Sequence, residues 1–298
     1  MRILVIGSEG FIGSHCVTHF SNKKDTVYGV DLFEQPSSSY HYIKTARFLP
    51  DFEEILQHGF DAIINCAGNG NVPYSMSHPV VDFESNCLDT IRILEAIRRL
   101  APSCKYLHLS SAAVYGNPVR LPVREDDASR PLSPYGWHKV IAENLCREYA
   151  GLFNLSIAIA RPFSVYGPGL KKQMFWDWYQ KAKASDGNME LLGTGKESRD
   201  YIYIKDLVLA LDLILQKGEL RGEVYNLASG KETRIEVAAG LFFSGLDFPI
   251  RYTYNGIVRE GDPLNWCADI SKLTGMGFTC SHDMSAGIAE LHNWLKNF

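Results

Sequence analysis

The sequence lacks the features of a secreted, membrane-spanning or nucleic-acid-binding protein. Its 7 cysteines are scattered, odd in number and form no Cys-x-x-Cys pair, so we expect reduced thiols in a cytoplasmic protein, without disulfides or a metal site. No uncharged apolar run is long enough to span a membrane, and we expect no signal peptide before the apolar segment that starts at Ile3. Lys and Arg total 30 against 34 Asp and Glu, a net charge of −4 with no basic stripe, which argues against a nucleic-acid partner.

What the sequence does contain is the pattern of an α/β protein. Its 298 residues, 46% hydrophobic and 21% charged, are enough for about two globular domains. Continuous apolar runs alternate with segments of helical periodicity, which predicts a doubly wound parallel sheet covered on both faces. Strands are expected at 3–6, 26–30, 62–65, 106–109, 155–160 and 223–227, with a short strand pair between 195 and 204. Helices are expected at 12–20, 83–100, 133–150, 175–183, 204–216 and 286–295.

A glycine-rich turn joins the first expected strand to the first helix. Gly7, Gly10 and Gly13 form a G-x-x-G-x-x-G pattern, in which the missing side chains let a pyrophosphate approach the free N–H groups that begin the helix. The second strand ends at Asp31, whose carboxylate can accept hydrogen bonds from a ribose 2′-hydroxyl and repel a 2′-phosphate. An ordinary glycine turn and a turn-forming aspartate are the alternatives. Together the two features favour a dinucleotide site that prefers NAD to NADP.

Three further residues suggest acid–base chemistry. Tyr135 and Lys139 are one helical turn apart, so they share a helix face, and a nearby ammonium favours the phenolate that a general base needs. Ser111 follows a strand, at the end where open parallel sheets place their sites. Each feature alone has an ordinary alternative: a solvated helix face for the pair, a turn or cap for the serine. Their convergence on one cleft favours a catalytic site.

These motifs together resemble the extended short-chain dehydrogenase/reductase family, and the resemblance covers nearly the whole chain. Beyond the glycines, Ser111 and Tyr135-x-x-x-Lys139, the matching positions are 61–68, Val72, Ser75, Pro79, Asn86 and the Arg-Pro-Phe-Ser-Val-Tyr-Gly of 161–167. The family's usual asparagine is replaced by Ser164 in that last stretch. The resemblance implies a Rossmann-like NAD-binding domain at 1–166, completed by 201–230, and a smaller mixed α/β lobe for substrate at 167–200 and 231–298.

The resemblance also implies roles for individual residues. Ser111, Tyr135 and Lys139 are the expected catalytic residues. The expected NAD contacts are Gly7, Gly10, Phe11, Ile12, Gly13, Asp31, Ala67, Asn86, Tyr135, Lys139 and Pro162. The expected contacts to a nucleotide-sugar substrate are Ser75, Ser111, Ser164, Arg199, Arg259 and Trp266, the two arginines being suited to a diphosphate.

Ala112 and Ala113 discriminate within the family. Family dehydratases carry an Asp-Glu pair after the catalytic serine or threonine, and decarboxylases tend to carry a glutamate there, whereas alanines cannot transfer protons. The pattern is most similar to UDP-glucose (UDP-galactose) 4-epimerases, which implies NAD-dependent epimerisation at C4 through a 4-keto sugar. A bulky ring at Trp266 then implies a preference for plain hexoses over N-acetylated ones.

Two other readings stay open at this point. A reductase of 4-keto-6-deoxy nucleotide sugars, using NAD(P)H, carries the same serine, tyrosine and lysine. A non-catalytic dinucleotide-binding scaffold can share the fold, since fold does not fix function. The resemblance also implies a homodimer, formed through helices at 83–100 and 134–150 from each subunit.

Overall fold

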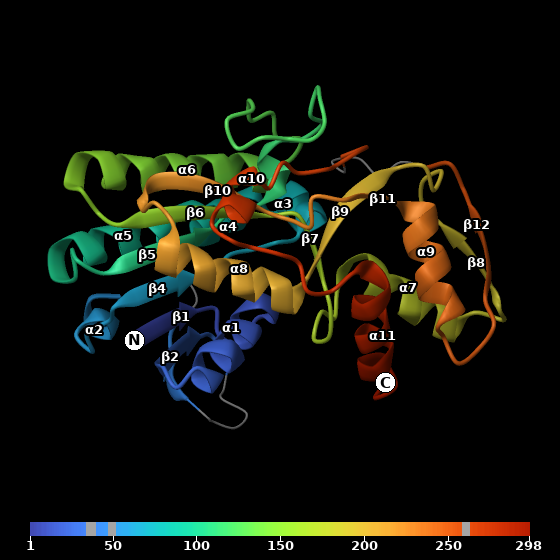
Figure 1. The fold of residues 1–298 in the computed structure, drawn as a ribbon, viewed down its shortest axis with the longest axis horizontal. Coiled ribbons are helices and arrows are strands. Elements are labelled where there is room, and N and C mark those ends of the chain that lie inside the picture. The colour runs from blue at the N-terminus through green and yellow to red at the C-terminus, as the bar shows by residue number, and fades with distance from the viewer. Residues whose placement is uncertain (34–39, 47–51, 258–262) are drawn as a thin grey trace.

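The computed structural model describes residues 1–33, 40–46, 52–257 and 263–298. Its centre is a seven-stranded parallel sheet in the spatial order β10-β6-β5-β4-β1-β2-β3 (Figure 1). Its strands are β1 (Arg2–Ile6), β2 (Thr26–Asp31), β3 (His41–Lys44), β4 (Ala62–Asn65), β5 (Lys105–Leu109), β6 (Ile157–Pro162) and β10 (Arg221–Leu227). The strand order reverses between β1 and β4, and open α/β sheets bind ligands in the crevice beyond the carboxyl ends of such a pair. The α/β class and the parallel sheet expected from the sequence are confirmed.

Both faces of the sheet are covered because successive side chains of a buried strand point to opposite sides. On one face Ile3 and Val5 pack in a core with α1 (Phe11–Asn22) and α8 (Ile204–Lys217). On the other, Leu4 and Ile6 pack in a core with α2 (Phe52–Leu56), α5 (Asp89–Leu100) and α6 (Pro134–Phe153). This arrangement explains why the strands read as continuous apolar runs.

The helix expected at 83–100 is interrupted. The structure instead has α4 (Pro79–Phe83), a π-helical turn (Glu84–Leu88) and then α5. Asn86 lies in that turn, where its side-chain Nδ2 donates to the backbone oxygens of Asp82 (3.0 Å) and Asn69 (3.4 Å). A π turn inserts one extra residue into the helical ladder, and such turns are frequent at functional sites. The sequence pattern missed it because the apolar period on either side is helical.

The second lobe is built from short strands and three larger helices. β7 (Ser164–Tyr166), β9 (Ser198–Tyr203) and β11 (Glu232–Arg234) form one sheet, and β8 (Asn188–Leu191) and β12 (Arg251–Tyr254) form another. The expected strand pair between 195 and 204 is wrong, because that stretch contains β9 alone, which pairs with distant strands. The larger helices are α7 (Gln173–Ala184), α9 (Ile235–Ser244) and α11 (Met284–Leu295). Two shorter helices, α3 (Val72–Ser77) and α10 (Ser271–Gly275), lie against the large lobe.

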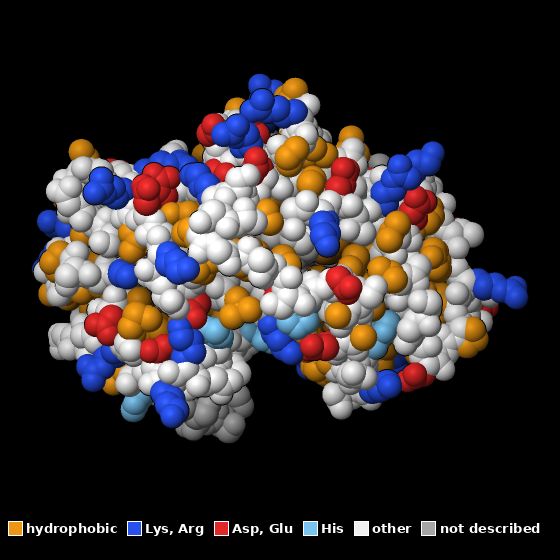
Figure 2. Space-filling view, viewed as in Figure 1, with side chains coloured by type: hydrophobic (Ala, Val, Ile, Leu, Met, Phe, Trp, Pro, Cys, Tyr) orange, Lys and Arg blue, Asp and Glu red, His pale blue; other side chains and the backbone are white. Residues whose placement is uncertain are grey.

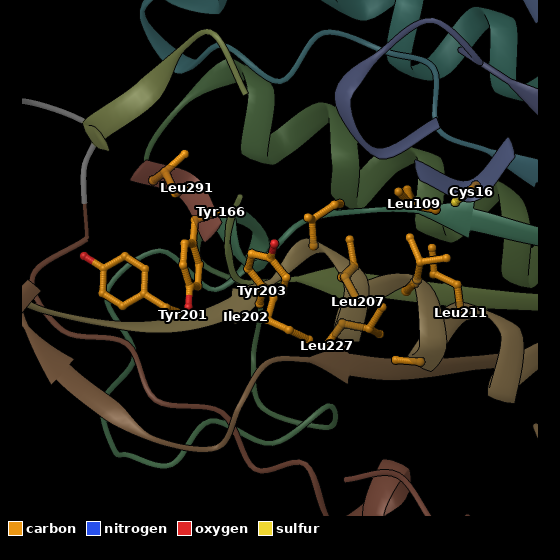
Figure 3. Packing of buried hydrophobic residues seen from close by; sticks show 14 of the residues in the cluster. Cys16, Leu109, Tyr166, Tyr201, Ile202, Tyr203, Leu207, Leu211, Leu227 and Leu291 are labelled. Atoms are coloured by element: carbon orange, nitrogen blue, oxygen red, sulfur yellow. The ribbon is translucent and has the colours of Figure 1, made fainter. Parts of the chain in front are cut away.

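One apolar core runs through both lobes. Figure 3 shows Cys16 and Leu109 at one end of this cluster, Leu207 and Leu227 in its middle, and aromatic side chains from the second lobe at the other end. On the surface, Figure 2 shows a notch at the lower edge between the part built around α1 and the part built around α11. Among the described residues, no helix is both long and apolar enough to cross a membrane.

Candidate active site

The glycine-rich turn leaves no room for a side chain at Gly7 or Gly13. Gly7 has φ +79°, and a Cβ on it would lie 2.9 Å from the backbone nitrogen of Ala67. A Cβ on Gly13 would lie only 2.0 Å from the carbonyl oxygen of Gly7, so α1 can approach β1 only because residue 13 has no side chain. Gly10 is the N-cap of α1 and supplies no side-chain cap, which leaves the first N–H groups of the helix for another acceptor. Phe11 and Ile12 are half-buried in its first turn.

Asp31 lies where the sequence predicts, at the carboxyl end of β2 beside this turn. Its buried carboxylate accepts hydrogen bonds from the backbone N–H of Glu9 (2.8 Å) and of Leu32 (2.7 Å). One function visible in the structure is therefore to fix the glycine-rich turn. Each carboxylate oxygen has more than one lone pair, so the same group can still accept from a ribose hydroxyl, which stays a prediction.

The loop after β4 packs against the glycine-rich turn. Gly68 has φ +120°, and a Cβ there would lie 2.6 Å from Oδ1 of Asn86 and 3.4 Å from Nζ of Lys139. Oδ1 of Asn86 is buried, and no group within the described ranges donates to it. Of the expected cofactor residues, Ala67 lies in the loop after β4 and Pro162 is the last residue of β6, while Asn86 lies in the π-helical turn and Lys139 in α6. A glycine-lined cradle with an unpaired acceptor beside it fits a dinucleotide with a ribose hydroxyl.

Ser111, Tyr135 and Lys139 are brought together, as predicted. Ser111 caps a short 3-10 helix (Ala112–Val114), and its hydroxyl forms a hydrogen bond with the phenol of Tyr135. Ser133 caps α6 by accepting from the N–H of Gly136 at 3.2 Å, which places Tyr135 in the first turn of that helix. Lys139 follows one turn later, and its Nζ lies 5.9 Å from the ring centre of Tyr135 and donates to the carbonyl of Leu109 at 2.9 Å.

The pKa values of this pair are governed by burial. Burial raises the pKa of the Tyr135 phenol to about 12, although its hydrogen bond with Ser111 opposes the rise. Burial lowers the pKa of the Lys139 ammonium to about 8, against the opposite effect of nearby acidic groups, of which Asp82 is the strongest. The sequence predicted that the ammonium of Lys139 would lower the pKa of Tyr135 toward the working pH. The protein alone does not do this, because removing the phenolate from water costs more than the serine hydrogen bond returns.

The substrate residues predicted from the resemblance divide into two groups. Trp266 is buried, donates from Nε1 to the carbonyl of Gly116 at 3.0 Å, and stacks beneath the guanidinium of Arg199 at 5.8 Å. Ser75 is also buried, but both hydrogen-bonding roles of its hydroxyl are taken by the backbone: it donates to the carbonyl of Val72 and accepts from the N–H of Tyr135 at 3.2 Å. It therefore holds the start of α6.

Two predicted positions complete this set. Ser164 begins β7 and is half-buried. Arg259 lies outside the described residues. Contact of any of these side chains with a sugar remains a prediction.

Sequence analysis missed two buried ionic clusters behind the site. In one, Arg161 bonds both oxygens of Glu143 (2.7 and 2.6 Å), and Glu143 also accepts from Ser110, the neighbour of Ser111, at 2.6 Å. In the other, Asp82 accepts from His138, which directly precedes Lys139. The available signal was an acidic residue one helical turn after Lys139 and another one turn before Asn86, both on faces that should be apolar. In the described ranges, no group of three or more His, Cys, Asp or Glu is arranged to hold a metal ion.

Comparison with known proteins places this geometry in a family. The model of the NAD-dependent epimerase/dehydratase family matches residues 3–228. The UDP-glucose epimerase YtcB of Bacillus subtilis, itself uncharacterised, is 30% identical over 291 residues, covering 91% of this chain and 90% of the relative.

Solved structures give the same result. MoeE5, solved with UDP-glucuronic acid and NAD, superposes with a TM-score of 0.90 at 29% identity and covers 100% of this chain and 99% of its own. The UDP-glucuronic acid 4-epimerase of Bacillus cereus, solved with the same two ligands, gives 0.89 at 28% identity with the same coverage. The family is NAD-dependent, which confirms the cofactor expected from Gly7, Gly10, Gly13 and Asp31. The chain belongs to the NAD-dependent epimerase/dehydratase family.

Proposed function

We propose that this protein epimerises a nucleotide-diphosphate sugar at C4 through a transient 4-keto sugar. The observation that carries the proposal is the buried Ser111–Tyr135–Lys139 cluster, followed by alanines at 112 and 113. The cluster can move one proton to and from a sugar hydroxyl. The alanines supply no second acid or base for eliminating water. The UDP-sugar epimerases among the similar proteins support the same chemistry.

The residues of this chain act on the proton, while NAD supplies a reversible hydride acceptor and a positively charged ring. Tyr135, as phenolate, takes the proton of the 4-hydroxyl as the C4 hydrogen leaves with its electron pair, so the C4–O bond becomes a carbonyl. Ser111 hydrogen-bonds Tyr135, and in this proposal it also holds the same sugar oxygen. Lys139 contributes positive charge that favours the phenolate. Return of the hydride to the opposite face of C4, with the proton from Tyr135, gives the epimer with no net oxidation.

The apolar surface of α4 and α6 supports a homodimer as part of this proposal. Val80 and Phe83 on α4 and Trp137 and Ile141 on α6 are all exposed, although the two helices pack against each other. Large side chains that gather on neighbouring helices are typical of an interface. A second copy bringing the same two helices would cover them by a symmetric contact. Sedimentation or light scattering of the wild type and of Trp137→Glu tests this, a dimer that dissociates being the expected result.

The activity itself is tested with purified protein and a panel of nucleotide sugars. We expect bound NAD in the purified protein and interconversion of C4 epimers without added cofactor or change in absorbance of reduced nicotinamide. Tyr135→Phe should lose roughly 10²–10⁴-fold in turnover while it still binds NAD. Consumption of a 4-keto sugar with stoichiometric NAD(P)H would establish the reductase instead. NAD binding without turnover of any sugar would favour the non-catalytic scaffold.

A further inference from the structure

A fully buried carboxylate lies behind the catalytic helix turn. Asp82, on α4, has no exposed surface. Its Oδ1 accepts from Nδ2 of Asn69 in the loop after β4 at 2.8 Å, and its Oδ2 accepts from Nδ1 of His138 on α6 at 2.5 Å. Its backbone oxygen accepts from Nδ2 of Asn86 at 3.0 Å. One residue thus joins the cofactor-side loop, the π turn and the helix that carries Tyr135.

His138 is the point at which this carboxylate meets the catalytic helix. It lies between Tyr135 and Lys139 in the sequence, and its side chain is 12% exposed. Its backbone carbonyl accepts from the thiol of Cys87 at 3.2 Å, and its ring packs edge-on against Phe83 at 5.4 Å. Side chain and backbone of one residue therefore tie this turn of α6 to α4 and to the π turn. Motion of Lys139 relative to the loop at Gly68 is restricted as a result.

Asp82 also differs in charge from the other ionisable groups around Lys139. On β5, burial lowers the pKa of His108 well below its ordinary value, so its imidazole is neutral. Burial raises the pKa of Cys87, on the π turn, to about 12 and that of Cys146, on α6, still further, so both thiols are neutral.

The remaining acid near Lys139 is already paired. Glu143, also on α6, is bonded by Arg161 at 2.6 Å and by Arg147 at 3.1 Å, which offsets its charge. Asp82 accepts a hydrogen bond from the imidazole of His138, and in the part of the chain that the structure describes it pairs with no arginine. Among the acidic groups near Lys139, Asp82 raises the pKa of the ammonium most.

We propose that Asp82, held by His138 and Asn69, is a positioning residue of the catalytic site, whose negative charge keeps Lys139 cationic beside Tyr135. The proposal rests on the proposed function only in giving Lys139 and Tyr135 a catalytic use. The charge relation between Asp82 and Lys139 can be measured without any substrate.

The test is the titration of Lys139 by NMR in protein labelled with ¹³C at lysine Cε, the resonance being assigned by its loss in Lys139→Met. In Asp82→Asn, which keeps the side-chain shape, we expect Lys139 to titrate about one pH unit lower, as is typical when a neighbouring opposite charge is removed. In the epimerisation assay both limbs of the profile of kcat/KM against pH should move to lower pH, because Asp82 also raises the pKa of Tyr135. A purely structural role would lower activity without moving the limbs.

Asp206→Asn is the matched control. Asp206 is another fully buried carboxylate bonded to an imidazole, that of His282 at 3.1 Å, but it lies on α8, on the opposite face of the sheet. This variant should lose stability and leave the Lys139 titration unchanged. His138→Asn keeps an N–H donor and the Asp82 charge, so it should also leave the titration unchanged and is a second control.

An unshifted Lys139 in folded Asp82→Asn, or a downward shift in His138→Asn or Asp206→Asn, would overturn the proposal. A shift in Asp82→Asn in a protein that epimerises no sugar would overturn the proposed function and leave this charge relation standing.

Discussion

Replacing Arg161 by methionine is the perturbation whose cost the structure defines best. The guanidinium is buried and donates to both oxygens of Glu143, to the hydroxyl of Tyr115 at 2.7 Å and to the carbonyl of Glu125 at 3.1 Å. Methionine is similar in length but makes none of these bonds. Glu143 would keep Ser110 and the half-exposed Arg147 as partners, inside an apolar core.

Breaking one side of a buried ion pair typically costs about 3–5 kcal/mol, because the remaining buried charge loses its main partner. At roughly 2–4 °C per kcal/mol for chains of this size, Arg161→Met should lower Tm by about 10 °C in a calorimetric or circular dichroism melt at pH 7. The difference should shrink in acid. Burial raises the pKa of Glu143, but the bonds from Arg161 outweigh this effect and hold the pKa below its ordinary value. The pair therefore stabilises the fold at pH values above the ordinary pKa of a glutamate, and this stabilisation is lost as the pH falls through the lower pKa of the folded state.

Two further variants make the reasoning refutable. Arg147→Ala removes a cation from the same carboxylate at a largely solvated position, and should cost no more than about 1 kcal/mol. The double variant Arg161→Met with Glu143→Met should recover much of the loss, since neither charge then remains buried. The reasoning is refuted if the free energies of unfolding of Arg161→Met and Arg147→Ala differ by less than about 1 kcal/mol. It is also refuted if the double variant is less stable than Arg161→Met.

Three other variants test the site. Gly13→Ala should abolish NAD binding in calorimetric titration, because its Cβ would lie 2.0 Å from a backbone oxygen, whereas Gly10→Ala, at 3.2 Å, should bind NAD with a reduced affinity; equal affinities would contradict the packing argument. The wild type should bind NAD more tightly than NADP, and Asp31→Ala should reduce or reverse that preference; a wild type that prefers NADP would refute the assigned ribose contact. Trp266→Gly should raise turnover of N-acetylhexosamine substrates relative to plain hexoses, and equal turnover of both by the wild type would show that Trp266 is only core.

The fold was predictable where one physical signal dominates. β1 and β4 are fully buried on both faces, so their apolar runs identified them, and the Gly7–Gly13 turn followed from their connection to a helix. His41–Lys44 was missed because an edge strand that is half-exposed carries no such run. The strands of the second lobe pair with residues far away in the sequence, as β9 does with β7 and β11, and a local pattern contains no information about that pairing.

The site residues that could be predicted are those whose side-chain type alone indicates a reaction. Ser111, Tyr135 and Lys139 predict proton transfer from the chemistry of their own side chains, whatever the surrounding fold. Asp82 and Glu143 are buried by the helices that cover them, and a local sequence pattern does not show which helices those are. Their positions on faces expected to be apolar were the one available signal. Ser75 was expected to contact substrate. In the structure its hydroxyl donates to the carbonyl of Val72 on α3 and accepts from the N–H of Tyr135 on α6, and contact with a sugar stays a prediction.

The position of β10 in the central sheet constrains how the chain folds as it is synthesised. β6 ends at Pro162, but its second neighbour, Arg221–Leu227, emerges from the ribosome only after β7, α7, β8, β9 and α8. Until then β6 has an unpaired edge of buried-type residues, which is a surface for aggregation or for chaperones. Part of the second lobe is therefore synthesised before β10 can complete the central sheet. A fragment that stops near residue 200 should be insoluble even though it contains the whole glycine-rich turn and all three residues proposed as catalytic.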